Sequence, residues 1–357
     1  MDTHRNIRVE ARLWERVNGR IRCLVCERKC ILGRGQRGFC GNYENIDGEL
    51  IHVGYGLVSA IESRPIEIKP FFHYWPGSSA LTFSFWGCNF LCPWCQNWSL
   101  SKRKPKPGLD KYVPPERLVE LALRAGDDGL CASFNEPTIG FDYMIDVFEL
   151  GRKHGLYGTI VTNGYMTLKA LKMLIEAGVD GYSIDIKGCP ETYRKYMGTP
   201  NGAEVVLRNA KYILDNNGHV EMVFLIVPKA NDSNECIRWV LEKLYDTLGP
   251  DTPLHINRYY PAYKYDEPPT PLSTLLTVYE EAKKMGFHYV YIGNIGPGTP
   301  YENTYCPKCG RTLVVRYGTE VVEYNITSDN RCPRCGYKIN IKGKYIAKSK
   351  SRWISWI

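Results

Sequence analysis

The feature that most constrains the fold is a regular alternation of strand-like and helix-like segments in the middle of the chain. Between Leu81 and Gly293, short runs rich in β-branched and aromatic residues alternate with amphipathic stretches of helical length. We expect strands at 81–87, 129–134, 157–162, 181–187, 219–227, 253–260 and 288–293. We expect helices at about 115–125, 142–154, 167–177, 203–216, 233–246 and 271–285. This order favours parallel strands joined by right-handed crossovers, so the predicted class is α/β, with a partial barrel of the (β/α)6 type as its core.

The composition is that of a globular chain with room for a sizeable core. It has 357 residues, of which 44% are hydrophobic and 24% charged. We divide it into an N-terminal cysteine-rich extension at 1–80, the (β/α) core at 81–299 and a C-terminal part at 300–357 with a basic tail. No run of about 18 apolar residues is present, and the first 22 residues are charged throughout. We therefore expect no membrane span, no export signal and a cytoplasmic location.

Cysteine is the most informative residue type in this chain. In a long chain without an export signal, fourteen cysteines indicate metal ligands or redox groups rather than a disulfide scaffold. Eleven of them fall into three clusters, each of which makes a separate prediction.

The C-terminal cluster consists of two C-P-x-C-G motifs, with 22 residues between Cys309 and Cys332. This pattern is typical of a zinc ribbon, in which four thiolates surround one ion and stabilise a small fold. The segments RTLVVRYG and TEVVEYNI between the motifs are expected to form its two strands. A rubredoxin-like iron site is the alternative, since the same four sulfurs accept either metal. The predicted ligands are Cys306, Cys309, Cys332 and Cys335.

The N-terminal cluster has the spacing C-x2-C-x3-C-x9-C, with glycines that allow the backbone to turn around a metal. It resembles ferredoxin spacing without matching it. The pattern is compatible with structural zinc, which we favour slightly, or with a second iron–sulfur cluster. The predicted ligands are Cys23, Cys26, Cys30 and Cys40.

The central cluster, Cys88-x3-Cys92-x2-Cys95, has three cysteines and directly follows the first predicted core strand. Three thiolates on a 4Fe–4S cluster leave one iron open to a substrate or cofactor. The nearby aromatic residues Phe90 and Trp94 are expected to shield such a cluster and to provide a surface for a planar base. Zinc with three thiolates and a water is the alternative.

Further motifs follow the predicted strands and extend this pattern. They are FNEPTI (134–139), VTNGY (161–165), DIKG (185–188), PLHINRYYPAYK (253–264), YVYIGN (289–294) and NTYCPKCG (303–310). Together with the C-x3-C-x2-C loop, the sequence resembles the radical S-adenosylmethionine (SAM) superfamily, in the branch of the AmmeMemoRadiSam-system proteins and near the pyruvate formate-lyase activating enzymes. The resemblance extends to about residue 345. It implies a radical SAM barrel with cysteine-rich extensions and an enzyme of the oxidoreductase type.

The resemblance also implies the chemistry of the central site. Cys88, Cys92 and Cys95 would hold a 4Fe–4S cluster whose open iron is chelated by SAM. Reductive cleavage would then give methionine and a 5′-deoxyadenosyl radical that abstracts hydrogen from a substrate. Trp94 would face the adenine, Asn135 and Glu136 would lie near the methionyl group, and Thr162 and Asn163 would bind the carboxylate or ribose. The superfamily has a Gly-Gly-Glu type of turn where this chain has Phe134 and Asn135, and the N-E-P motif alone is also compatible with a helix start.

Residues at the later strand ends complete the predicted cofactor site. Asp185 and Lys187 share one face of their strand and are assigned to the SAM ribose or carboxylate, with a surface ion pair as the alternative. His255 and Asn257 also share a strand face and are assigned to the SAM or substrate pocket. A structural role is the alternative for His255.

The sequence does not name the substrate, and three hypotheses remain open. The first is modification of a small molecule or of a protein from the same gene neighbourhood, where the resemblance implies Memo-like and AMMECR-like partners. The second is activation of a glycyl-radical enzyme. The third is a zinc-ribbon nucleic-acid binder or RNA modifier, based on the lysine-rich tail 338–352, which equally fits a solvated extension. A ferredoxin or flavodoxin is the expected electron donor.

Overall fold

The computed structural model describes residues 8–347 and 353–357, which form two compact units. Unit 1 contains the described residues of Met1–Ser63, Ala80–Asp180 and Ile354–Ile357, and unit 2 contains those of Arg64–Ser79 and Gly181–Trp353. Lys348 to Arg352 of the basic tail lie outside the described residues. Within the described part, no helix is long and apolar enough to cross a membrane.

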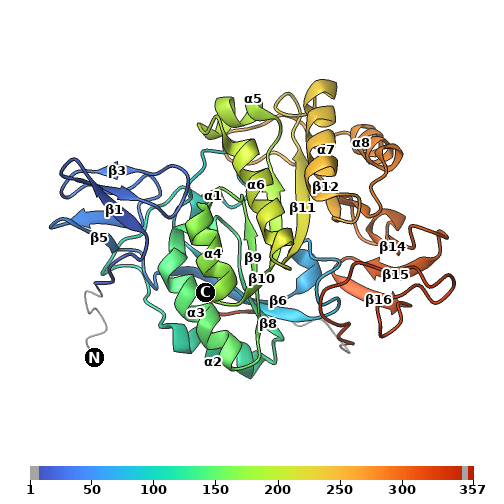
Figure 1. The fold of residues 1–357 in the computed structure, drawn as a ribbon, viewed down its shortest axis with the longest axis horizontal. Helices are drawn as coiled ribbons and strands as arrows, with labels where there is room; N and C mark the ends of the chain where they lie inside the picture. Colours follow the sequence, from blue (N-terminus) through green and yellow to red (C-terminus); the bar gives the residue numbers. More distant parts are fainter. Residues whose placement is uncertain (1–7, 348–352) are drawn as a thin grey trace. The chain divides into compact units, whose positions relative to one another are not determined.

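Unit 1 combines small antiparallel sheets with parallel core strands (Figure 1). Its N-terminal part has a three-stranded sheet and a hairpin, formed by β1 (Trp14–Val17), β2 (Arg20–Cys23), β3 (Ile31–Leu32), β4 (Tyr43–Ile46) and β5 (Glu49–His52). The core strands follow in the order β17 (Ile354–Ser355), β6 (Val58–Pro65), β7 (Ser79–Phe85), β8 (Gly129–Ala132) and β9 (Tyr157–Thr162). Strands β7, β8 and β9 are parallel, whereas β17 pairs antiparallel with β6.

Helices of unit 1 pack on these parallel strands. They are α1 (Trp98–Ser101), α2 (Pro115–Ala125), η2 (Pro137–Gly140), α3 (Phe141–Lys153) and α4 (Leu168–Glu176). In Figure 1 the green helices α2, α3 and α4 lie next to one another, and α3 contacts both β8 and β9.

Unit 2 repeats the parallel pattern. Strands β10 (Val179–Ile186), β11 (His219–Ile226), β12 (Leu254–Arg258) and β13 (Val290–Gly293) are neighbours in chain order and pair in parallel. Its helical elements are η1 (Ile66–Ile68), α5 (Pro190–Thr192), η3 (Tyr193–Met197), α6 (Gly202–Asp215), α7 (Asn234–Leu248), α8 (Leu272–Met285) and η4 (Pro300–Glu302). The C-terminal strands β14 (Thr304–Tyr305), β15 (Thr312–Tyr317) and β16 (Glu320–Tyr324) form a separate antiparallel sheet.

Local signals in the sequence account for the helix ends. The Thr167 side chain accepts a hydrogen bond from the Ala170 N–H at the start of α4, and Ser233 does the same for Cys236 at the start of α7. Helix α2 begins at Pro115 and ends before Gly126, which has a left-handed φ of 71°. Each core strand and helix predicted from the alternating pattern is present within a few residues, so the predicted α/β class with mainly parallel strands is confirmed.

The parallel strands determine where the site lies in unit 1. The loops that carry Cys88, Glu136 and Asn163 follow β7, β8 and β9 respectively. Because the carboxyl ends of neighbouring parallel strands meet at one edge of a sheet, these three loops come together.

Candidate functional site

The three-cysteine loop leaves the end of β7 and folds back on α1. Gly87, with φ of 105°, precedes Cys88. The Phe90 N–H donates to Cys88 Sγ at 3.3 Å, and Cys95 Sγ lies 3.1 Å from Ser101 Oγ. All three cysteines are half-buried, while the aromatic rings of Phe90 and Trp94 are buried, with exposed fractions of 2% and 3%. The loop therefore holds three thiols beside apolar aromatic surface.

The spacing of these thiols argues against a single metal ion. Among the described residues, Cys88, Cys92 and Cys95 do not form a group whose sulfurs all lie within 4.8 Å of one another. Zinc with Zn–S bonds of about 2.3 Å would bring its tetrahedral sulfurs to about 3.8 Å. A 4Fe–4S cluster places each thiolate on a different iron and so spaces the sulfurs more widely. The donor set fits an iron–sulfur cluster better than zinc.

Glu136 joins the loops that follow β8 and β9. Its Oε1 accepts hydrogen bonds from the Thr138 N–H at 3.0 Å, the Thr138 hydroxyl and the Thr162 hydroxyl at 2.8 Å, and its Oε2 accepts from the Asn163 N–H at 2.7 Å. Burial raises the pKa of Glu136, and hydrogen bonds from Thr138 and Asn163 oppose that shift. The carboxylate also caps the short helix η2, so the predicted helix-start role of N-E-P is present as well.

Asn89 connects this carboxylate network to the cysteine loop. Its Oδ1 accepts from Asn163 Nδ2 at 2.7 Å, and its side chain is fully buried. The sequence analysis did not select Asn89, because nothing distinguishes a spacer residue between two cysteines from an exposed one until the neighbouring loop is placed. Asn135 acts nearby: its Nδ2 donates to the Phe85 and Gly87 carbonyls at 2.6 and 2.7 Å and so holds the start of the cysteine loop.

The backbone at Phe134 explains how this chain makes the turn without glycine. Phe134 has φ of 66°, in the left-handed region that glycine adopts without strain. Its carbonyl accepts a hydrogen bond from the Asn97 side chain, which ties the turn to the end of the cysteine loop. This chain therefore differs from a Gly-Gly-Glu turn in residue type, but the backbone at Phe134 has the left-handed conformation that glycine favours.

Replacing Phe134 by glycine is expected to be tolerated, whereas replacing it by valine is expected to destabilise the protein. Glycine removes the left-handed strain, so Phe134→Gly should keep the free energy of unfolding within about 1 kcal/mol of the parent despite the lost ring contacts. A β-branched side chain is the least compatible with this conformation, so Phe134→Val should lower it by about 1–3 kcal/mol. Urea titration of both variants measures the difference, and equal stability of the two would contradict a strained turn.

Replacing Glu136 by glutamine is expected to disrupt the hydrogen bonds to this carboxylate, although the two side chains are nearly equal in size. One acceptor oxygen becomes an N–H₂ group that faces an N–H or O–H donor, which leaves a buried donor unsatisfied. We expect a loss of about 1–3 kcal/mol in the free energy of unfolding, measured by urea titration. The matched control is Glu120→Gln on the exposed face of α2, where the ion pairs with Arg117 and Arg124 are screened by solvent, so their loss should lower the free energy of unfolding far less.

The remaining predicted cofactor residues lie in unit 2. Lys187 Nζ is 2.7 Å from Asp185 Oδ2, so these two side chains form the ion pair considered as the alternative. In β12, the Asn257 amide oxygen occupies the space beside Gly293 that a β-carbon would fill. The assignment of these residues to SAM remains a prediction.

His255 belongs to a buried cluster around Glu221. Its Nε2 lies 2.7 Å from Glu221 Oε2, and its ring stacks on Tyr291. Glu221 also accepts from the backbone N–H groups of Phe72 and His73. Burial opposes ionisation, yet the hydrogen bonds from His219 and His255 hold the pKa of Glu221 well below its usual range. His255 thus has a structural partner set of its own, and its role in the SAM pocket remains a prediction.

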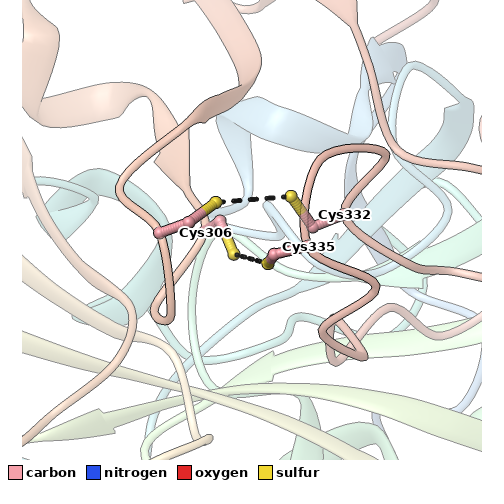
Figure 2. A group of neighbouring side chains, drawn as sticks. Cys306, Cys332 and Cys335 are labelled. Atoms are coloured by element: carbon pink, nitrogen blue, oxygen red, sulfur yellow. Dashed lines mark hydrogen bonds between the residues drawn. The ribbon is translucent and has the colours of Figure 1, made fainter.

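The C-terminal cysteines form a compact group in unit 2. Their four sulfurs all lie within 4.8 Å of one another, with Cys306 Sγ 3.5 Å from Cys335 Sγ and Cys309 Sγ 3.7 Å from Cys332 Sγ. Figure 2 shows the labelled thiols directed at a common centre. These distances are close to the value of about 3.8 Å for thiolates around one zinc ion.

The two C-P-x-C-G motifs form matching turns around this centre. In each, the glycine N–H donates to the carbonyl of the first cysteine at 2.9 Å, and Gly310 and Gly336 have φ of 70° and 71°. Strands β15 and β16 form the predicted hairpin. Burial raises the pKa of the Cys332 thiol, but N–H donors of Arg334 and Cys335 outweigh it and lower the pKa to about 6, which favours the thiolate that binds metal.

The N-terminal cysteines lie in unit 1 and are arranged differently. Cys23, Cys26, Cys30 and Cys40 all line one cavity, which Asn89 of the central cysteine loop also lines. Unlike the C-terminal four, they are not drawn together within 4.8 Å of one another.

Comparison with known proteins places this site in a family. A family model described as the radical SAM superfamily matches residues 85–242. An uncharacterized protein of Methanocaldococcus jannaschii is 39% identical over 336 residues, which cover 93% of this chain and 99% of that protein. The pyruvate formate-lyase 1-activating enzyme of Escherichia coli is 27% identical over 168 residues, 45% of this chain and 65% of that enzyme. Among solved structures, Streptococcus suis SuiB bound to S-adenosylmethionine is 14% identical with a TM-score of 0.47, covering 62% of this chain and 50% of that chain.

The family model begins at the last residue of β7 and includes the three-cysteine loop, the Glu136 turn and the Thr162–Asn163 loop, the parts that the structure brings together. The chain is an enzyme of the radical SAM superfamily, similar to the pyruvate formate-lyase activating enzymes.

Proposed function

We propose that this enzyme cleaves SAM reductively at a 4Fe–4S cluster held by Cys88, Cys92 and Cys95. The observation that supports this most is the three-thiol loop itself, which follows β7 beside the Glu136 and Asn163 loops and offers three ligands to a cluster that has four irons. When bound and reduced, the cluster would donate one electron to the sulfonium of SAM, which would split into methionine and a 5′-deoxyadenosyl radical able to remove a hydrogen atom from the substrate.

The protein residues position the cofactor and exclude water. Phe90 and Trp94 supply the apolar wall of the cysteine loop, and Asn135 fixes the loop where it leaves β7. Glu136 keeps Thr162 and Asn163 in place, and its Oε2 has an unused acceptor site for the SAM ammonium. Asp185, Lys187, His255 and Asn257 are proposed to contact SAM or substrate from unit 2.

Zinc in the C-terminal group and a low-potential electron donor complete this proposal. The sulfur distances at Cys306, Cys309, Cys332 and Cys335 support a structural zinc site. Reductive cleavage requires one electron for each SAM, so a ferredoxin or flavodoxin is the proposed donor. Because an open iron is destroyed by oxygen, we propose that the enzyme works in a reducing cytoplasm.

For the substrate, we favour a small molecule or another protein over the alternatives. The proposed partners are Memo-like and AMMECR-like proteins. They are tested by mixing the purified proteins with SAM and reductant and by searching for a mass change that depends on this enzyme.

Activation of a glycyl-radical enzyme is a second candidate, favoured by a specific similarity. Two relatives from Methanocaldococcus jannaschii carry the name putative glycyl-radical enzyme activating enzyme and match 54% and 51% of this chain. A glycyl-radical protein from the same genome should then show the doublet EPR signal of a glycyl radical after incubation with this enzyme, SAM and reductant. Lack of that signal with a functional cluster would exclude this candidate.

SAM cleavage itself is tested with the anaerobically reconstituted full chain. With dithionite, the protein should convert SAM to 5′-deoxyadenosine and methionine in equal amounts, measured by liquid chromatography with mass detection. Absence of 5′-deoxyadenosine from protein that contains iron and sulfide would overturn the proposed function.

A further inference from the structure

The four N-terminal cysteines line a cavity and are not gathered around one common centre. Cys23 is the last residue of β2, and Cys30 and Cys40 precede β3 and β4 respectively. The backbone of Cys26 pairs with that of Met166 in an isolated antiparallel β-bridge. All four line one cavity that is partly open to solvent. The segment is fixed by hydrogen bonds, including Thr167 N–H to the Val25 carbonyl at 3.2 Å. Backbone hydrogen bonds therefore hold together a pocket that is lined by four thiols.

The distances between the cysteine sulfurs in this pocket differ from those between the four C-terminal cysteine sulfurs. Among the described residues, no three of the N-terminal sulfurs lie within 4.8 Å of one another, and no thiol–thiol hydrogen bond joins any two of them. One zinc ion requires all four sulfurs at about 3.8 Å. A 2Fe–2S cluster needs two close pairs, because each iron takes two thiolates, whereas a 4Fe–4S cluster gives each thiolate its own iron. The absence of a close group of three argues against one zinc ion, and it suits a 4Fe–4S cluster, in which every thiolate lies on its own iron.

A buried amide points into the same pocket and lacks a protein acceptor. Asn89 is fully buried, and its Nδ2 has no partner that meets hydrogen-bond geometry. Asn89 lines the cavity together with all four N-terminal cysteines, so its free amide lies among their thiols. On the other side, Asn42 Nδ2 lies near Cys40 and donates to its carbonyl at 3.3 Å. Amide N–H groups directed at cysteine sulfurs are the donors that stabilise an iron–sulfur cluster and set its potential.

The pocket adjoins the loop of the central cysteines within unit 1. The Arg28 guanidinium donates to the Asn89 carbonyl, and Asn42 Nδ2 donates to the Trp86 carbonyl at 2.8 Å. A β-carbon at Gly87 would lie 2.5 Å from the Cys40 carbonyl oxygen, so only glycine allows this approach. The N-terminal cysteine pocket and the central cysteine loop are therefore in direct contact.

We propose that Cys23, Cys26, Cys30 and Cys40 hold a second 4Fe–4S cluster, with the Asn89 amide as a hydrogen-bond donor to it. This site goes beyond SAM cleavage and does not depend on it, because none of its four ligands belongs to the central loop. It replaces the structural zinc that the spacing alone favoured.

The deciding experiment uses the full chain with Cys88, Cys92 and Cys95 all changed to alanine. After anaerobic reconstitution, iron, sulfide and zinc are counted and the iron is examined by Mössbauer spectroscopy. We expect about four irons and four sulfides per chain with the spectrum of a 4Fe–4S cluster, and about one zinc. A variant with no iron and two zinc ions, a 2Fe–2S spectrum, or a metal-free N-terminal site would overturn the proposal.

Two further variants assign the ligands. Cys26→Ala in the otherwise unchanged chain should lower the iron content by about half, from about eight to about four. Asn89→Leu should keep the iron but shift the midpoint potential of the second cluster relative to the parent, and an unchanged potential would contradict the role given to this amide. If SAM cleavage failed while the triple variant kept its four irons, only the proposed function would be lost.

Discussion

Changing any one of Cys88, Cys92 and Cys95 to alanine is expected to abolish SAM cleavage and to remove the iron bound at the central loop. Each thiolate holds a different iron, and no other cysteine lies in the loop that connects β7 to α1. Loss of one ligand therefore leaves an iron that nothing nearby replaces. The rate of 5′-deoxyadenosine formation should fall to that of protein-free buffer, and the iron content should drop by about four per chain.

The matched control is Cys131→Ala. Cys131 is fully buried in β8, its Sγ lies 3.9 Å from the Ala132 carbonyl oxygen, and it belongs to none of the three cysteine clusters, so its loss removes a small apolar group without removing a ligand. This variant should keep the parent's iron content and cleavage rate. Cleavage at the parent's rate by any of the three loop variants would contradict the assignment.

Changing Cys306 or Cys332 to alanine is expected to release the metal of the C-terminal group and to unfold the small sheet around it. The core of this part is small: Leu313, Val314 and Ile339 pack with the cysteines. The same cluster also includes the unit 2 residues Phe72, Tyr289 and Tyr291. A structural zinc site contributes about 10–16 kcal/mol to the folding of a small domain, far more than such a core supplies. Zinc content should fall from about one to about zero per chain, and the amide hydrogens of β14, β15 and β16 should exchange rapidly.

Cys236→Ala serves as the control for this second prediction. Cys236 is buried in α7 and accepts a hydrogen bond from the Cys189 N–H at 3.0 Å, away from the four-cysteine group. It should lower stability by about 1 kcal/mol and leave the zinc content unchanged. Slow amide exchange in β15 of the Cys306 variant would show that the sheet folds without metal. If the parent instead contains one iron and no zinc in this group, the rubredoxin-like alternative applies.

The α/β class and the identity of the strands could be predicted because the alternating pattern is strong. The strand predicted at 157–162 and the helix predicted at 115–125 agree with β9 and α2 to the residue. The short antiparallel strands before residue 53 and strand β17 were not predicted, because two- to four-residue strands have too little periodicity to be recognised.

The site was predicted as a set of residues, whereas their connections required the structure. Glu136 follows β8, whereas Thr162 and Asn163 lie at the end of β9, and only the parallel pairing of these strands brings the two residues to the Glu136 carboxylate. Asn89 was missed because its buried amide has meaning only beside Asn163 and Cys26. The two four-cysteine clusters look alike in sequence, and the difference in sulfur spacing appears only in three dimensions.

The most direct test of the central claim is electron–nuclear double resonance on the reduced enzyme with SAM labelled with ¹⁵N at its amino group. If Cys88, Cys92 and Cys95 leave one iron open for SAM, the spectrum of the reduced cluster should show a hyperfine coupling to the label, and it should disappear in Cys92→Ala. A reduced enzyme that binds SAM but shows no coupling to the amino nitrogen would contradict the account.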